Sequence, residues 1–72
     1  MFSKKDFGAR IRQLRLEKHE SQPALADVLG VTITQISDME NGKTGTTLER
    51  LVTLCEYYQV SSDYLLGLSD ER

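Results

Sequence analysis

Few residues in this 72-residue sequence could carry out catalysis or hold a metal. Cys55 is the only cysteine and His19 the only histidine, so the chain can form neither an internal disulfide nor a zinc site with four nitrogen or sulfur ligands. A Cys55–His19 catalytic pair would need an exposed thiol, whereas Cys55 lies on an apolar helical stripe that is typical of a core position. The sequence has no nucleophile motif and no Gly-rich phosphate loop, and we therefore expect no enzyme, cofactor or metal.

Residues of the type and position that contact phosphate groups are more numerous. Gln22 and Thr32 stand at the starts of two expected helices, where free N–H groups and the helix dipole attract anions. Lys43 lies close to Gly42 and Gly45, so that its charge and exposed loop amides can approach one phosphate together. A second interpretation stays open for each of these residues. Gln22 and Thr32 could serve only as capping residues, and Lys43 could be a solvated loop lysine without a partner.

The elements that position these residues are predicted to be five short helices with tight connections. Helical spacing and capping signals place them at about residues 5–18, 22–29, 33–40, 48–58 and 64–66, and residues 69–72 are expected to fray. No segment has the alternation of a β-strand. The side chains expected to face inwards are Phe7, Ile11, Leu14, Leu25, Ala26, Leu29, Ile36, Met39, Leu48, Leu51, Val52, Cys55, Tyr58, Tyr64, Leu65 and Leu66.

The second and third predicted helices are joined by a very short turn. Such a turn forces two helices to cross at a steep angle, which requires a small residue at their contact and a residue that tolerates positive φ in the turn. Ala26 and Gly30 meet these two requirements, and the surrounding contact positions are apolar. The pattern indicates a helix-turn-helix, although a fold unit alone does not determine function.

The charges are distributed unevenly along the chain. The net charge of −2 and the isoelectric point near 5.2 argue weakly against a nucleic-acid partner. Residues 1–18, however, carry six basic and two acidic side chains, so one end of the molecule can face a polyanion. No apolar run reaches membrane-span length and the N-terminus does not resemble a secretion signal. We expect a single cytoplasmic domain over residues 1–72, with its core at about residues 6–68.

Four stretches of the sequence resemble the Cro- and phage-repressor-like family of regulators, often called Xre-type. They are RIRQLR (residues 10–15), LADVLGV (25–31), MENGK (39–43) and VSSDYLLG (60–67). The resemblance covers nearly the whole chain and implies an all-α, five-helix lambda-repressor-like DNA-binding domain. It also implies transcriptional control, most often repression, by a weak homodimer on a near-palindromic operator in double-stranded DNA.

The resemblance further implies roles for individual positions. The third helix would enter the major groove, with its outward residues reading base edges and the flanking residues contacting phosphates. Arg15 and Glu40 would form an ion pair that ties helix one to the end of helix three. Tyr57, Tyr64 and Leu68 would lie at the dimer contact. The residues implied to contact DNA are Gln22, Thr32, Ile33, Thr34, Gln35, Ser37, Asp38, Asn41, Lys43 and Thr44.

Several positions depart from the family's pattern. The base-reading positions carry Ile33, Thr34 and Asp38 instead of amides or guanidinium groups, so none is a bidentate donor. Ile33 could contact the C5-methyl of thymine or simply flank the buried stripe of its helix. Glu20 stands where the family usually has an apolar residue. These departures and the acidic net charge leave a second hypothesis open: an antitoxin-like or anti-repressor-binding protein-interaction module on the same fold.

Overall fold

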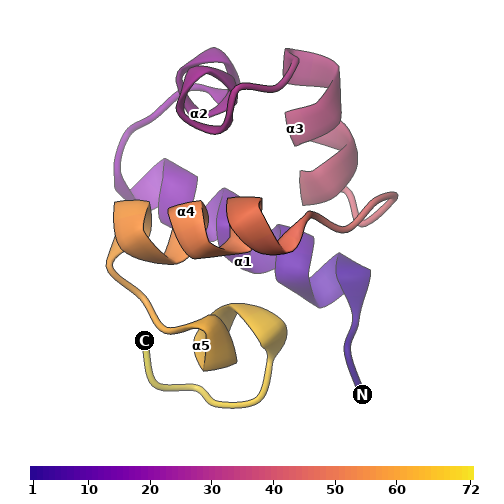
Figure 1. Ribbon diagram of the computed structural model, residues 1–72, viewed down its shortest axis with the longest axis vertical. Helices are drawn as coiled ribbons and strands as arrows, with labels where there is room; N and C mark the ends of the chain where they lie inside the picture. Colours follow the sequence, from indigo (N-terminus) through magenta and orange to yellow (C-terminus); the bar gives the residue numbers. More distant parts are fainter.

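The computed structural model describes residues 1–72 as five α-helices and no β-strand (Figure 1). The helices are α1 (Lys4–Glu17), α2 (Gln22–Leu29), α3 (Ile33–Glu40), α4 (Leu48–Tyr58) and α5 (Ser62–Leu66). In Figure 1, α4 lies in front of α1. The helices α2 and α3 lie above this pair in the view, and α5 lies below it. The predicted all-α, five-helix fold is therefore confirmed. None of the helices combines the length and apolar character that crossing a membrane requires.

Each helix begins at a serine or threonine whose hydroxyl accepts a hydrogen bond from the backbone N–H three residues later. These bonds satisfy N–H groups that have no partner within the helix. Gly30, with a φ of +67°, ends α2 in the left-handed conformation that the sequence predicted for the turn. The capping residues are Ser3, Ser21, Thr32, Thr47 and Ser61, with N···O distances of 3.1–3.3 Å.

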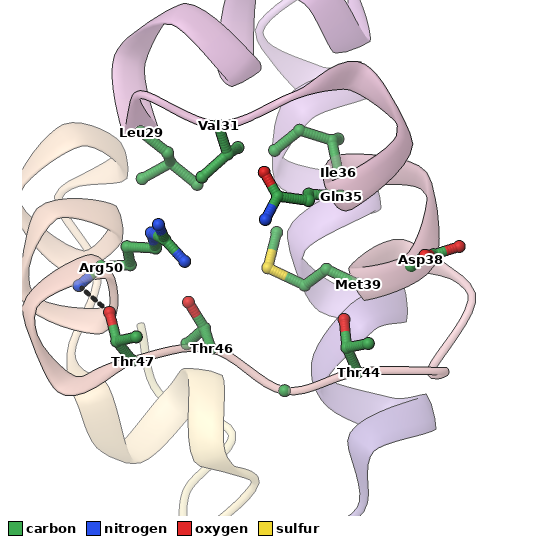
Figure 2. Close-up of a pocket in the computed structure, with 11 residues that line it drawn as sticks. Leu29, Val31, Gln35, Ile36, Asp38, Met39, Thr44, Thr46, Thr47 and Arg50 are labelled. Carbon is green, nitrogen blue, oxygen red and sulfur yellow. Dashed lines mark hydrogen bonds between the residues drawn. The ribbon is translucent and has the colours of Figure 1, made fainter.

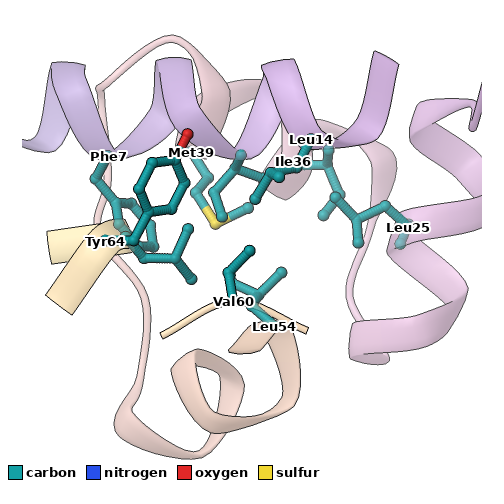
Figure 3. Close-up of a cluster of buried hydrophobic side chains, with 11 residues drawn as sticks. Phe7, Leu14, Leu25, Ile36, Met39, Leu54, Val60 and Tyr64 are labelled. Atoms are coloured by element: carbon teal, nitrogen blue, oxygen red, sulfur yellow. The ribbon is translucent and has the colours of Figure 1, made fainter. Parts of the chain in front are cut away.

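The core receives at least one fully buried side chain from every helix. Figure 3 shows apolar side chains of α1 and α3 packed against those of α4 and α5. Because the core joins all five helices, none of them can detach without exposing apolar surface. The largest side chains with less than 2 % exposure are Phe7, Ile11, Leu25, Ile36, Leu54 and Leu65.

A close backbone approach joins α1 to the end of α3. A Cβ atom built on Gly8 would lie 2.2 Å from the carbonyl oxygen of Met39 and 2.7 Å from that of Glu40. Only a residue without a side chain permits this approach. The sequence analysis did not single out Gly8, because a glycine inside a helix gives no sign of the element that packs against it.

The inner face of α4 differs from the prediction. Leu48 and Val52 are exposed by 79 % and 56 %, whereas Leu54, which was not predicted to face inwards, is fully buried. Leu51 and Cys55 are half-buried and pack against the core. Apolar residues surround much of this helix, so two stripes with helical spacing were available, and packing against α2 and α5 selects the one that contains Leu54.

The last residues are folded back onto the molecule. The Arg72 guanidinium donates hydrogen bonds of 2.7 and 2.8 Å to the two carboxylate oxygens of Glu17. The Ser61 N–H donates to the carbonyl oxygen of Arg72 at 2.6 Å. In this structure the end of the chain thus has hydrogen-bond partners in α1 and before α5, which the expectation of fraying at residues 69–72 did not consider.

Candidate nucleic-acid interface

The start of α3 is fixed by a reciprocal pair of hydrogen bonds. The Thr32 hydroxyl accepts from the Gln35 N–H at 3.1 Å, and the Gln35 side-chain oxygen accepts from the Thr32 N–H at 2.9 Å. This capping box leaves the N–H groups of Ile33 and Thr34 without a partner inside the helix. The first turn of α3 therefore presents free donors and the positive end of the helix dipole to an anion.

The two sides of α3 differ sharply in exposure. Ile36 is 1 % exposed and Met39 is 4 % exposed, so this side belongs to the core. Ile33 is 49 % exposed, and Thr34 beside it is also exposed. Ile33 is thus not part of the buried stripe, and its side chain is available for a contact outside the fold.

The segment that follows α3 is held by backbone hydrogen bonds to the end of that helix. The Lys43 N–H donates to the Asp38 carbonyl oxygen at 2.9 Å, and the Gly42 N–H donates to that of Met39 at 3.2 Å. The Asn41 side-chain amide donates to the Ser37 hydroxyl at 3.4 Å. These bonds fix the course of the backbone, while the Lys43 and Thr44 side chains remain exposed.

A buried ion pair ties α1 to the end of α3. The Arg15 guanidinium donates to the two Glu40 carboxylate oxygens at 2.7 and 3.1 Å, and both side chains are largely shielded from solvent. The hydrogen bond to Glu40 is the main reason why the pKa of Arg15 lies above its usual value. Arg15 also donates to the Glu20 carbonyl oxygen at 2.8 Å, and so connects both helices to the segment that leads into α2.

Gln22 is bound to the same ion pair. Its side-chain amide nitrogen donates to Glu40 at 3.2 Å, which holds the side chain in place at the start of α2. One amide hydrogen and the amide oxygen remain for other partners. Gln22 is therefore linked through Glu40 to α3, the helix that carries Thr32 and Ile33.

Glu20 has partners that the sequence analysis did not find. Its carboxylate accepts hydrogen bonds from the hydroxyls of Tyr57 and Tyr58, and the Lys18 ammonium lies 3.6 Å from the centre of the Tyr57 ring. Burial, followed by the bond to Glu20, raises the pKa of Tyr58 above its usual range. In the sequence, only the two adjacent tyrosines near the end of the chain could have indicated such a site. Their hydrogen bonds to Glu20 could not be predicted, because they depend on how α4 packs.

The same contacts bear on the expected dimer surface. Tyr57 is bound to Glu20 and Tyr64 is only 9 % exposed, so both side chains are used within one chain. Leu68 is 73 % exposed and remains available. Apolar exposure is found instead on α4, at Leu48 and Val52, which lie one helical turn apart.

A hollow of about 410 Å³ opens between the end of α2, α3, α4 and the segment that connects α3 to α4 (Figure 2). Leu29 and Val31 form one wall, and the Arg50 and Gln35 side chains point into the space. Asp38 lies at its rim with the carboxylate turned away. Arg50 was not among the residues expected from the sequence to contact a partner.

The residues first considered for catalysis lie in unsuitable surroundings. Cys55 is half-buried, and burial raises the pKa of its thiol, so less of it is the nucleophilic thiolate at neutral pH. His19 has a φ of +55° and follows the end of α1 as an exposed residue. No group of three or more His, Cys, Asp or Glu side chains is placed to hold a metal ion.

Comparison with known proteins identifies relatives over most of the chain. A family profile described as helix-turn-helix matches residues 11–65. The transcriptional regulator PrpR of Mycobacterium tuberculosis is 34 % identical over 71 residues, which are 99 % of this chain and 15 % of PrpR. The uncharacterized regulator YobD of Bacillus subtilis is 36 % identical over 62 residues, which are 86 % of this chain and 55 % of YobD. The chain therefore spans about half or less of the length of these relatives.

Solved structures share the fold. The P22 c2 repressor, solved in complex with a synthetic operator, is 36 % identical, with a TM-score of 0.80 and coverage of 88 % of this chain and 96 % of that one. The restriction-modification controller protein C.AhdI of Aeromonas hydrophila is 27 % identical, with a TM-score of 0.75 and coverage of 86 % and 94 %.

Proposed function

Because this chain belongs to the Xre-type helix-turn-helix family, we propose that it is a regulator that binds specific sites in double-stranded DNA. In this proposal α3 enters the major groove, and its first turn lies closest to the base edges. Occupation of an operator is sufficient to block other proteins, so repression is the simplest outcome of binding. The site of action is then the compartment that holds the DNA, which in a bacterium is the cytoplasm.

The exposed first turn of α3 is the observation that carries the proposal. Ile33 and Thr34 project from a helix whose opposite side is buried and whose end is held by the Arg15–Glu40 ion pair. A rigidly held helix with an exposed first turn can place side chains at base edges without a large ordering cost. The remaining proposed contacts are Gln22, Thr32, Gln35, Ser37, Asp38, Asn41, Lys43 and Thr44.

These residues divide into two proposed groups. Phosphate contacts come from helix starts, at Gln22 and Thr32, and from the segment after α3, at Asn41, Lys43 and Thr44. Base contacts come from α3 itself. The Gln22–Glu40 hydrogen bond supports this division, since it holds one phosphate contact in fixed register with the base-reading helix.

A titration of labelled duplex DNA with the protein, followed by fluorescence anisotropy, tests the proposal. At physiological salt, random DNA should bind with a Kd of about 10⁻⁴–10⁻⁶ M, and a site selected from a random pool should bind at least about 1,000-fold more tightly. Failure to bind random duplexes even at low salt would reject the proposal. That result would favour the second hypothesis, a protein-interaction module on the same fold. The net charge of −2 and the acidic side chain of Asp38, near the end of α3, also fit this second hypothesis.

We also propose that the protein binds DNA as a weak homodimer on a near-palindrome. The similarity to a phage repressor solved with its operator supports a symmetric site. Tyr57 and Tyr64 are not part of the proposed contact, because the fold already uses them. Leu48, Val52 and Leu68 replace them as the exposed apolar residues in the C-terminal half of the chain.

A further inference from the structure

The hollow between α2, α3 and α4 has the two features that recognise a small organic anion. It carries one cation, Arg50, which takes part in neither of the two ion pairs of the structure and whose guanidinium donates no hydrogen bond. It also has an apolar wall, formed by the half-buried side chains of Leu29 and Val31. Its volume of about 410 Å³ lies within the range of pockets that hold small molecules.

We propose that this hollow binds a small carboxylate with a compact apolar body. The planar Arg50 guanidinium can pair with both carboxylate oxygens, which is the geometry that distinguishes arginine from lysine. The Gln35 amide faces Arg50 from the opposite side of the hollow, and the Thr46 hydroxyl lies at its edge, so two more polar groups converge on the anion (Figure 2). The apolar body lies against Leu29 and Val31.

The apolar wall favours this ligand over a DNA phosphate. A phosphodiester has no apolar part to cover Leu29 and Val31, and its charge would have to be desolvated beside them. A carboxylate on a short hydrocarbon chain satisfies the guanidinium and covers the apolar wall at the same time. Direct contact between Arg50 and DNA is therefore the competing interpretation that the experiment must exclude.

The position of the hollow connects it to the proposed DNA-binding surface, and this part of the inference rests on the proposed function. Gln35 lines the hollow and also closes the capping box at the start of α3, and Thr44 lines it from the segment that carries Lys43. A bound anion neutralises Arg50 and adds a negative charge behind residues proposed to contact phosphates. Ligand and DNA should therefore each weaken the binding of the other by the same factor.

Binding is tested on the free protein with sodium hexanoate as the probe and 1-hexanol as the uncharged control. Saturable changes in the NMR amide signals of Leu29, Val31, Gln35 and Arg50 are expected, with a Kd of about 1 mM for so small a ligand. Arg50→Gln should weaken hexanoate binding about tenfold, because it removes the charge and the paired donors. Arg12→Gln, which removes an exposed arginine of α1 that does not line the hollow, should leave hexanoate binding unchanged. Thermal melts establish that both variants are folded.

The second measurement compares DNA affinity in about 20 mM sodium hexanoate with DNA affinity in about 20 mM sodium chloride. This hexanoate concentration is about twenty times the expected Kd. Hexanoate should lower affinity about fivefold for the wild type but at most about twofold for Arg50→Gln, because a tenfold weaker Kd leaves the variant only partly occupied at this concentration. Equal binding of 1-hexanol, undiminished binding of hexanoate to Arg50→Gln, or no binding at all would each overturn the proposal. So would a loss of DNA affinity in Arg50→Gln without hexanoate that exceeds the effect of hexanoate on the wild type (about fivefold), since Arg50 would then contact DNA directly. If the wild type binds no DNA, the proposed function fails, while the NMR titration still shows whether the hollow binds hexanoate.

Discussion

At the scale of single residues, the exposure of the Ile33 side chain most requires a functional explanation. It is a large apolar residue, 49 % exposed, at the first position of a helix otherwise buried on one side. In the major groove it can pack on the C5-methyl group that distinguishes thymine. Thr34 beside it adds a methyl and a hydroxyl, so we expect the pair to prefer sites with A·T base pairs.

Replacing Ile33 by alanine should lower the affinity for a selected site by about 1 kcal/mol, roughly fivefold, because one base contact is lost. The melting temperature should change little, since the side chain is outside the core. The loss should nearly disappear on a site in which uracil, which lacks the methyl, replaces the contacted thymine. Val28→Ala removes a comparably exposed apolar side chain from α2 and should cost nothing on either site. An equal loss on the thymine and uracil sites would refute the assignment.

Lys43 should act differently, through phosphate and without sequence preference. Each neutralised phosphate contributes about −0.9 to the slope of log K against log salt concentration. Lys43→Ala should therefore weaken binding to all duplexes by a similar factor and flatten the slope by about 0.9. Lys18→Ala should leave the slope unchanged, because the Lys18 ammonium already lies over the Tyr57 ring. A loss restricted to the selected site would show that Lys43 reads bases.

At the scale of elements, the packing of α1 against α3 depends on one glycine. A Cβ atom on Gly8 would meet the backbone oxygens of Met39 and Glu40, which cannot move aside like a flexible side chain. Gly8→Ala should thus separate the two helices and cost about 1–3 kcal/mol, which for a domain of this size lowers the melting temperature by about 5 °C or more. Gly45→Ala is the matched control, since a Cβ there meets nothing within 4 Å. Thermal denaturation of both variants gives the comparison, and equal melting temperatures would contradict this account of the packing.

The sequence could predict helix limits better than helix faces. Capping by Ser21 and Thr32 and the turn at Gly30 depend on residues within one or two turns of each other, so local chemistry was sufficient. The burial of Leu54 could not be predicted, because it depends on which other elements reach α4. The same reason hid the Gly8 approach and the binding of Glu20 by two tyrosines, both of which join residues far apart in the sequence.

In the candidate site too, residues chosen from local sequence signals could be predicted, and those that depend on distant packing could not. Thr32, Ile33 and Lys43 could be selected from their places at a helix start or after a helix end, and the structure leaves all three exposed. Arg50 could not be selected, because its position three residues into α4 resembles that of any solvated helix residue. It becomes noteworthy only when α3 and the connecting segment enclose the space into which it points.

At the scale of the whole molecule, one chain offers a single α3 and hence reads only one half-site. Two copies related by a two-fold axis would place their recognition helices in successive major grooves, about 34 Å apart. The selected site should therefore be a near-palindrome whose half-sites are about 10 base pairs apart, centre to centre. Footprinting of one isolated, asymmetric half-site would count against a dimer.

The geometry can be tested by changing the distance between the half-sites. Inserting about 5 base pairs rotates one half-site to the opposite face of the DNA, so affinity should fall at least about tenfold, while inserting about 10 should restore part of it. Val52→Glu places a charge on the exposed apolar side of α4 and should abolish this dependence on spacing without lowering the melting temperature. Leu16→Glu introduces the same charge at an equally exposed leucine on α1, and this variant should still depend on the spacing of the half-sites. If Val52→Glu keeps the full preference for the original spacing, the dimer contact lies elsewhere than on α4.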